Sequence, residues 1–166
     1  MDYILAIQKK LCPQGWKVPL AIMTSDDTKT LTEELLHRNN LFGLDASQLT
    51  IMKQEKVPAM LDNDARFALE GTRLLLETKP HGHGDVHTLL YQHNLTKQWS
   101  EQGIKWVVFF QDTNPLIFRS VIPVVGVSSE QDFEMNTVGI RRKPEEPVGA
   151  ITKLVHKDGR NLVINV

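Results

Sequence analysis

Short apolar runs that alternate with helical patterns limit what this chain can fold into. Val18–Thr24 is a continuous apolar run of the length typical of a buried parallel strand, and Gln48–Met52 is a second run. Between them, residues 31–36 carry leucines at helical spacing, and Ser25–Asp27 supplies residue types that cap helix N-termini. Strands that alternate with helices in this way predict an α/β fold.

The same patterns predict further elements along the chain. Helical spacing indicates a helix over residues 3–11 and another from Val86 to Gln102, which Gly103 ends. Lys105–Phe110 is the most apolar strand candidate, and polar residues 111–114 follow it. The last third is typical of strands with a hairpin turn at Asp158-Gly159. These strands are expected at Phe133–Arg142, Val148–His156 and Leu162–Val166, which makes the predicted three-layer sheet a mixed one.

Composition limits the class of protein. The chain has 166 residues, enough for one domain with a real core, and a net charge of −1, which argues against a dedicated nucleic-acid or membrane-surface protein. Cys12 is the single cysteine, so no intrachain disulfide can form and a reducing compartment is favoured. No apolar run is long enough to span a bilayer, and the first residues lack signal-peptide features. We therefore expect a cytoplasmic location.

The segment His81–His87 carries the strongest indication of a functional site. It places three histidines and a carboxylate within seven residues, with Gly82 and Gly84 between them. Glycine permits positive φ and leaves room for a ligand beside the backbone, and the helix expected next would add free N–H groups. Both features favour a polar, phosphorylated ligand.

Two other interpretations remain open for this segment. Zinc-dependent hydrolases use His-x-His-x-Asp-His, so a metal cluster of His81, His83 and Asp85 is an alternative. Here His87 comes one residue too late, and on a helix Asp85 and His87 point about 200° apart, which prevents both from facing one metal. A histidine-rich surface loop without a ligand is the other alternative.

Several segments, taken together and in order, resemble one enzyme family. They are Ile22–Thr28, Lys53–Val57, Asp62–Arg66, Lys79–His87, Phe109–Asn114 and Asp158–Arg160. In this order they look like the UDP-sugar pyrophosphorylases, broad-specificity relatives of the UDP-glucose and UDP-N-acetylglucosamine pyrophosphorylases. The resemblance implies a mostly parallel, Rossmann-like sheet of the nucleotide-sugar transferase type. It also implies uridylyl transfer from UTP to a sugar 1-phosphate, which gives a UDP-sugar and pyrophosphate.

The resemblance also implies roles for individual residues. Gln54 matches the glutamine that reads the uracil edge, Gly82 the glycine whose backbone contacts uracil, and Met23 a residue near the base. His83 matches the histidine beside the phosphate and sugar, where an imidazole N–H can hold an anionic oxygen. His81 and His87 are expected to act indirectly or structurally.

Two further matches lie in the last third of the chain. Asp112 matches the aspartate at the ribose and Mg²⁺, a metal that prefers oxygen ligands, and Gly149 lies where relatives touch sugar hydroxyls. His83 and Asp112 are therefore the expected catalytic residues.

The family's glycine-rich phosphate loop and its C-terminal lysine have no counterpart in this sequence. We therefore expect residues 1–166 to form a single incomplete nucleotidyltransferase domain that is inactive by itself. The alternative functions are the zinc-dependent hydrolase and a non-catalytic remnant that binds nucleotides.

Overall fold

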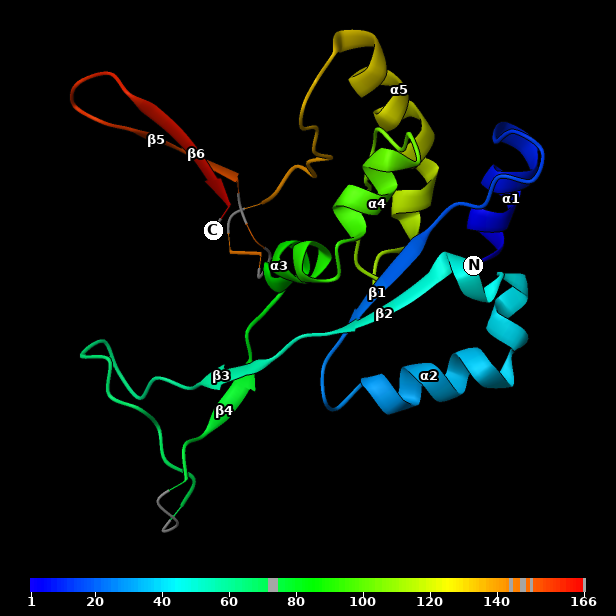
Figure 1. The fold of residues 1–166 in the computed structure, drawn as a ribbon. Helices are drawn as coiled ribbons and strands as arrows, with labels where there is room; N and C mark the ends of the chain where they lie inside the picture. The colour runs from blue at the N-terminus through cyan, green and yellow to red at the C-terminus, as the bar shows by residue number, and fades with distance from the viewer. Residues whose placement is uncertain (72–74, 144, 147–148, 150, 166) are drawn as a thin grey trace. The chain divides into compact units, whose positions relative to one another are not determined.

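The computed structural model describes the chain except for residues 72–74, 144, 147–148, 150 and 166 (Figure 1). The described residues form two compact units, Met1–Lys105 and Trp106–Val166. The fold is a mixed α/β fold, as predicted, built from helices and small two-stranded sheets. Within the described ranges, no helix has the length and apolarity required to cross a membrane.

The first unit is organised by a parallel strand pair with a helix between its members. β1 (Leu20–Thr24) pairs in parallel with β2 (Leu49–Lys53), with Leu20 opposite Leu49 and Thr24 opposite Lys53. α2 (Lys29–Arg38) and the 3₁₀ turns η1 (Asn40–Gly43) and η2 (Ala46–Gln48) make the crossover that a parallel pair requires. The expected parallel sheet is thus confirmed for these two strands; the other sheets of the described chain are antiparallel.

The crossover from α2 to β2 reverses through left-handed backbone. Asn40, Leu41 and Phe42 have φ between 51° and 52°, and Gly43 has φ of 83°. L-residues with side chains avoid this region, whereas glycine adopts it freely. Gly43 therefore ends the turn after α2, rather than the helix itself, which ends at Arg38.

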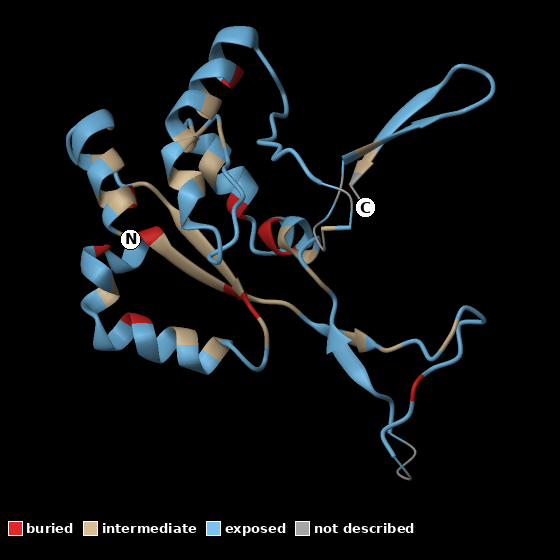
Figure 2. Cartoon of the chain, turned by 180° about the vertical axis from the view of Figure 1, so that it is seen from behind, coloured by how far each residue is buried: buried red, intermediate tan, exposed pale blue. Residues whose placement is uncertain are grey.

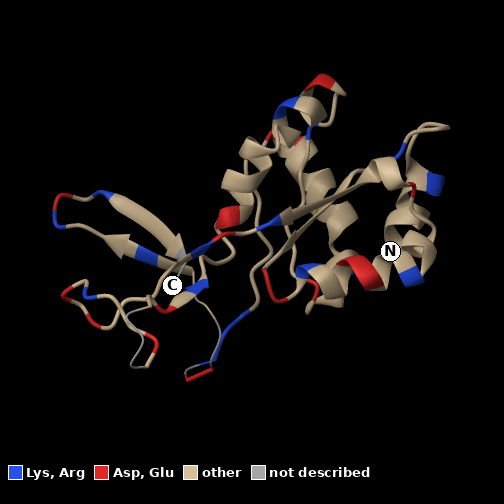
Figure 3. Ribbon diagram, turned by 60° about the horizontal axis from the view of Figure 1, so that its bottom comes forward, with Lys and Arg blue, Asp and Glu red and all other residues tan. Residues whose placement is uncertain are grey.

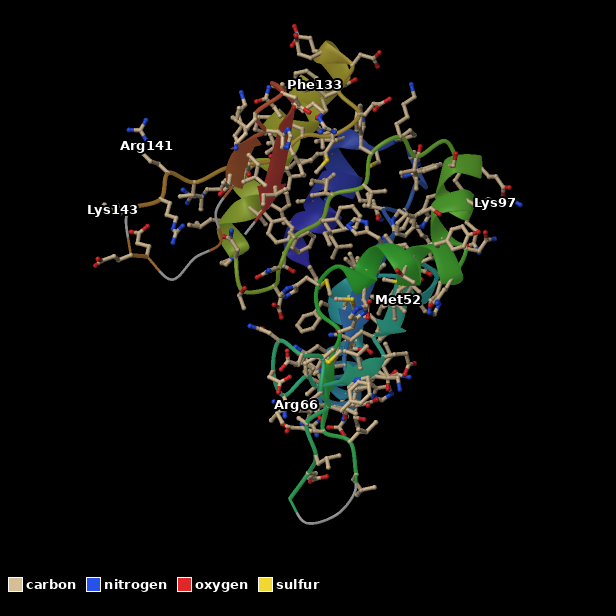
Figure 4. The ribbon with its side chains drawn as sticks, turned by 90° about the vertical axis from the view of Figure 1, so that its left-hand side faces the viewer. Met52, Arg66, Lys97, Phe133, Arg141 and Lys143 are labelled. Carbon is tan, nitrogen blue, oxygen red and sulfur yellow. The ribbon has the colours of Figure 1, made fainter. Side chains whose placement is uncertain are left out.

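Helices α3 (Asp85–Gln92) and α4 (Leu95–Glu101) cover the strand pair with apolar side chains. The core joins the fully buried Met52 of β2 to Leu89 and Leu90 of α3 and to Leu95 of α4. Figure 2 shows buried residues on the strand pair and on the helices beside it, and Figure 4 labels Met52. The single helix expected over 86–102 is interrupted at Asn94, whose φ is 56°.

Helix α1 (Asp2–Leu11) confirms the predicted first helix and is tied to the strand pair by buried amides. The side chain of Gln48, 4% exposed, donates to Gln8 Oε1 at 2.7 Å and to the Val18 carbonyl at 2.9 Å. Its own Oε1 accepts from the Asp45 N–H at 3.0 Å. These bonds hold the entry to β1 beside the entry to β2, so the register of the pair is fixed at its amino ends.

A two-stranded arm extends from the carboxyl end of β2. β3 (Lys56–Pro58) pairs antiparallel with β4 (Thr78–Pro80), and isolated bridges at Met60–Phe67 and Leu69–Leu76 continue the pairing outward. Arg66 lies out on this arm (Figure 4), where Asp62 accepts from it and from the Asp64 N–H. This Asx-type turn explains why acidic residues and Asn occupy that part of the sequence.

The second unit contains one turn, one helix and one hairpin among its described residues. η3 (Pro115–Arg119) precedes α5 (Val121–Gln131). The sequence patterns did not predict this helix. β5 (Ile151–Val155) and β6 (Asn161–Asn165) form the expected antiparallel hairpin. Gly159, with φ of 87°, and the Asp158 carboxylate, which accepts from the Arg160 N–H at 3.1 Å, close its turn.

Two predicted strands are wrong for this structure. Lys105–Phe110 and Phe133–Arg142 are irregular and have no ladder partner within the described residues. Most of their apolar side chains stay exposed: Val107 is 44% exposed and Ile140 85%. A strand exists only when a neighbour accepts and donates its backbone hydrogen bonds, so an apolar run without a neighbour remains an irregular segment.

Met52 is the first test of this packing. We expect Met52→Ala to reduce the free energy of unfolding by about 2–5 kcal/mol, because it leaves a cavity between β2 and the α3–α4 pair. Urea unfolding followed by circular dichroism measures the change. The control is Met135→Ala, a side chain that is 81% exposed, for which a change within about 0.5 kcal/mol is expected. Equal effects of the two substitutions would contradict the core assignment.

Asp45 makes stability depend on pH. The Lys17 ammonium at 2.5 Å, together with the Ser47 hydroxyl and N–H, holds the pKa of the Asp45 carboxyl far below its usual 3.8. Because the folded-state pKa is depressed, this stabilisation is present above the unfolded pKa and is lost as the pH falls through the folded value. We therefore expect Asp45→Asn to flatten the loss of stability on acidification below about pH 4 in urea titrations. An unchanged slope would contradict the ion pair.

Candidate functional site

Gln54 lies at the carboxyl end of the parallel strand pair. Its N–H donates to the Thr24 carbonyl at 2.8 Å, so the β1–β2 ladder continues to this residue. Its half-buried side chain turns toward the loop after β4, where Oε1 accepts from the Gly82 N–H at 3.1 Å. The structure therefore brings together the glutamine and the glycine that were matched separately to uracil contacts.

The pairing of β3 with β4 places residues 81–84, the glycine loop, beside Gln54. Lys56 lies opposite Pro80 in this ladder, and the His81 N–H continues it by donating to the Glu55 carbonyl at 3.3 Å. Gln54 and Gly82 are 28 residues apart in sequence, yet the arm leaves and returns at the same point. The carboxyl ends of parallel strands are where open α/β sheets place ligands.

The glycine loop leads directly into α3. Gly82 has φ of 118°, a value that only glycine adopts readily, and its carbonyl accepts from the Asp85 N–H at 3.1 Å. The His83 carbonyl accepts from the Val86 N–H at 3.2 Å as the helix begins. The Asp85 carboxylate contacts His81 Nδ1 across this turn. A helix start next to two glycines is thus confirmed.

Two more predicted site residues belong to this unit. His83 is exposed, and its ring makes no hydrogen bond with the described residues. Met23 lies opposite Met52 in the β1–β2 register and packs against the core cluster next to the strand end. Met23 is thus mainly a core residue in this structure, and its contact with a base stays a prediction.

A charged cluster lies at the same strand ends. The Asp26 carboxylate, in the loop after β1, lies 2.9 Å from Lys53 Nζ and 3.5 Å from Lys56 Nζ. The hydrogen bond from Lys53 lowers the pKa of Asp26, and the same bond raises the pKa of Lys53. Figure 3 shows acidic and basic residues interspersed around this strand pair. The cluster joins the β1–α2 loop to the segment that carries Gln54.

The glycine loop and the start of α3 do not form a metal cluster. Within the described part of the chain, which includes all of 81–87, no group of three or more His, Cys, Asp or Glu residues is arranged to hold a metal ion. His81 Nδ1 contacts Asp85 instead, and His83 is exposed to solvent. The zinc-hydrolase alternative therefore has no supporting geometry here.

Asp112 and Gly149 belong to the second unit and are described within it. Asp112 is exposed in a turn closed by the bond from the Asn114 N–H to the Gln111 carbonyl at 3.1 Å. Its carboxylate makes no ion pair with the described residues, so its oxygens remain available to a cation. Gly149 is exposed in irregular backbone. Their roles stay predictions.

Two sets of contacts at this site were not predicted from the sequence. Glu55 offers its carbonyl to His81, and Asp26 bridges two lysines that flank Gln54. Neither contact follows from local spacing, because each joins segments far apart in the chain. The antiparallel pairing of 56–58 with 78–80, which sets the Glu55–His81 bond, has no signal in these two short segments, each of which ends in a proline.

Known proteins resemble this chain over nearly its whole length. The family model for UTP–glucose-1-phosphate uridylyltransferase matches residues 3–161. A UDP-sugar pyrophosphorylase of Oryza sativa subsp. indica is 49% identical over this whole chain, and one of Arabidopsis thaliana is 46% identical. The chain spans 28% of the length of each of these relatives.

More distant proteins extend the match. The UDP-N-acetylglucosamine pyrophosphorylase of Saccharomyces cerevisiae is 27% identical over 90% of this chain, which spans 31% of that protein. A crystal structure of a candidate UDP-N-acetylglucosamine pyrophosphorylase from Entamoeba histolytica superposes with a TM-score of 0.61 at 18% identity. It covers 97% of this chain and 39% of its own, so the two share a fold. The family model and the plant relatives together show that this chain belongs to the UTP–glucose-1-phosphate uridylyltransferase family.

Proposed function

We propose that this chain provides the uridine-recognition part of an enzyme that transfers the uridylyl group of UTP to a sugar 1-phosphate, giving a UDP-sugar and pyrophosphate. The family match and the plant relatives named UDP-sugar pyrophosphorylases support the reaction class. Because the chain spans 28% of those relatives, the activity is assigned to the intact protein, in which residues 1–166 are the central part of the catalytic domain. A cytoplasmic location is part of the same proposal.

The contact between Gln54 and Gly82 carries this proposal. Gln54 Oε1 accepts from the Gly82 N–H, which fixes the plane of the amide, and Gln54 Nε2 makes no hydrogen bond with the described residues. Uracil offers a carbonyl acceptor beside an N3–H donor. An amide N–H and a carbonyl oxygen with a second lone pair are the complementary groups. At the strand ends, Gln54 Nε2 is the donor, and the carbonyl oxygens of Gln54 and Gly82 are the acceptors.

The remaining residues take roles that fit their chemistry. The exposed His83 imidazole, one residue after Gly82, would donate to an anionic phosphate oxygen or a sugar hydroxyl. Gly149 would contact sugar hydroxyls through its backbone. The exposed Asp112 carboxylate has the hard oxygens that Mg²⁺ prefers, and a bound Mg²⁺ would offset the charge of the phosphates.

The reaction requires two polyanions to approach each other. A phosphate oxygen of the sugar 1-phosphate forms a bond to the α-phosphorus of UTP, while the bond from that phosphorus to the bridging oxygen breaks and pyrophosphate leaves with the electron pair. Positioning and electrostatic stabilisation supply most of the rate enhancement in such displacements. The part of this chain in that task is to fix the uridine, which sets where the α-phosphorus lies.

Gln54→Ala in the intact protein tests this proposal. We expect the Kd for UTP to rise about 10–100-fold, because a base edge loses its partners at a cost of about 1–3 kcal/mol. We also expect the preference for UTP over CTP to fall, since cytosine presents a different edge. Isothermal titration calorimetry measures both quantities.

Gln98→Ala is the matched control for this experiment. Gln98 is an exposed glutamine on α4, so its substitution should leave the Kd and the nucleotide preference unchanged. If Gln54→Ala binds UTP with wild-type affinity and preference, uracil recognition by Gln54 is wrong.

The contribution of this chain alone gives a second prediction. We expect the 166-residue chain by itself to release no pyrophosphate from UTP and glucose 1-phosphate, because the sequence lacks the glycine-rich loop that holds the phosphates in this family. The intact protein should release pyrophosphate under the same conditions. Turnover by the isolated chain would overturn the first expectation. Uridine binding without turnover by the intact protein would favour a non-catalytic nucleotide-binding function over the proposed one.

A further inference from the structure

A closed ring of hydrogen bonds surrounds the glycine loop. The Glu55 carbonyl accepts from the His81 N–H at 3.3 Å, and His81 Nδ1 contacts the Asp85 carboxylate. The Asp85 N–H donates to the Gly82 carbonyl at 3.1 Å, and the Gly82 N–H donates to Gln54 Oε1 at 3.1 Å. The peptide bond between Gln54 and Glu55 closes the ring.

From this ring we infer that His81 and Asp85 are positioning residues for uracil recognition, an inference that rests on the proposed function. The pair acts on the base through Gly82 and Gln54 and does not touch the ligand. Neither residue belongs to the set matched to direct substrate contacts.

The pair spans the part of the loop that is otherwise least constrained. Gly82 and Gly84 carry no side chains, so the backbone between His81 and Asp85 has wide conformational freedom. Within the ring, the Asp85 backbone holds the Gly82 carbonyl and the Asp85 side chain holds His81. One residue at the start of α3 therefore fixes both ends of this short turn.

Fixing the turn orients the reading amide. Gln54 is a long side chain whose rotamers differ little in energy in open solvent, and ordering it has an entropic cost. The Gly82 N–H selects one orientation, with Nε2 left for the base, but only while Gly82 stays in place. Preorganisation of this kind raises affinity without adding a contact to the ligand.

The exposure of the two side chains suits an indirect role. The Asp85 side chain is 14% exposed and the His81 side chain 61%, so the carboxylate is the shielded member of the pair. The bond is therefore partly protected from water on the carboxylate side. His83, by contrast, has no ring partner among the described residues and remains the loop's candidate for direct ligand contact.

The test compares His81→Ala, His81→Asn and a control in the intact protein. Asn places an amide nitrogen near the position of Nδ1, so it can still bond to Asp85, whereas Ala cannot. We expect His81→Ala and Asp85→Ala each to raise the Kd for UTP about tenfold, as the loss of one charge-assisted hydrogen bond implies, and His81→Asn to stay within about threefold of wild type. His93→Ala, an exposed histidine at the other end of α3, should change nothing.

A double-mutant cycle distinguishes positioning from general loss of structure. If His81 acts through Gln54, then His81→Ala should have little further effect on UTP affinity in a Gln54→Ala background. Thermal unfolding of each single variant should remain within a few degrees of wild type.

Three results would overturn the inference. They are additive effects in the cycle, a His81→Asn variant as weak as His81→Ala, and full affinity in Asp85→Ala. Failure of the proposed function looks different, because the wild-type protein would then show no preference for UTP over CTP before any substitution is made.

Discussion

The antiparallel pairing of β3 with β4 is the constraint on which the candidate site depends. It returns the chain to the carboxyl end of β2 after the arm of residues 59–77, and it sets His81 beside Glu55. Without that return, the Gln54 side chain would have no Gly82 N–H to accept from. With it, a glycine N–H meets the Gln54 amide and the start of α3 follows within a few residues. Gln54 and Gly82 are therefore brought together by backbone pairing, and the Gln54 side chain completes the contact.

The core of the first unit supports this arrangement from one side. Met52 of β2 lies two residues before Gln54 and is fully buried among Leu89, Leu90 and Leu95, so the strand end and the helix after the glycine loop are packed against each other. Strand and loop therefore cannot shift independently.

Much of the first unit could be predicted from local patterns. The helix over 3–11, both parallel strands and the helical start after Gly84 agree with the structure, because apolar periodicity reports burial directly. The break at Asn94 and the left-handed turn at 40–43 were missed, since both depend on how the chain must reverse to pack. α5 was not predicted, and the unpaired runs at 105–110 and 133–142 were wrongly predicted to be strands. Apolar content there indicated strands but could not indicate whether a partner strand exists.

The sequence by itself determined the family and the residue types of the site: an amide at a strand end, two glycines among histidines, and a carboxylate after an apolar run. These follow from the chain because each is a local string with a local chemical meaning. Only the tertiary structure decided that Gln54 bonds to Gly82, that His81 contacts Asp85 and not a metal, and that Asp26 bridges Lys53 and Lys56. The Gln54–Gly82 and Asp26 contacts join segments separated by many residues, whereas the His81–Asp85 contact joins residues four apart where the glycine turn enters α3. Their formation depends on strand register and helix packing, which no local pattern encodes.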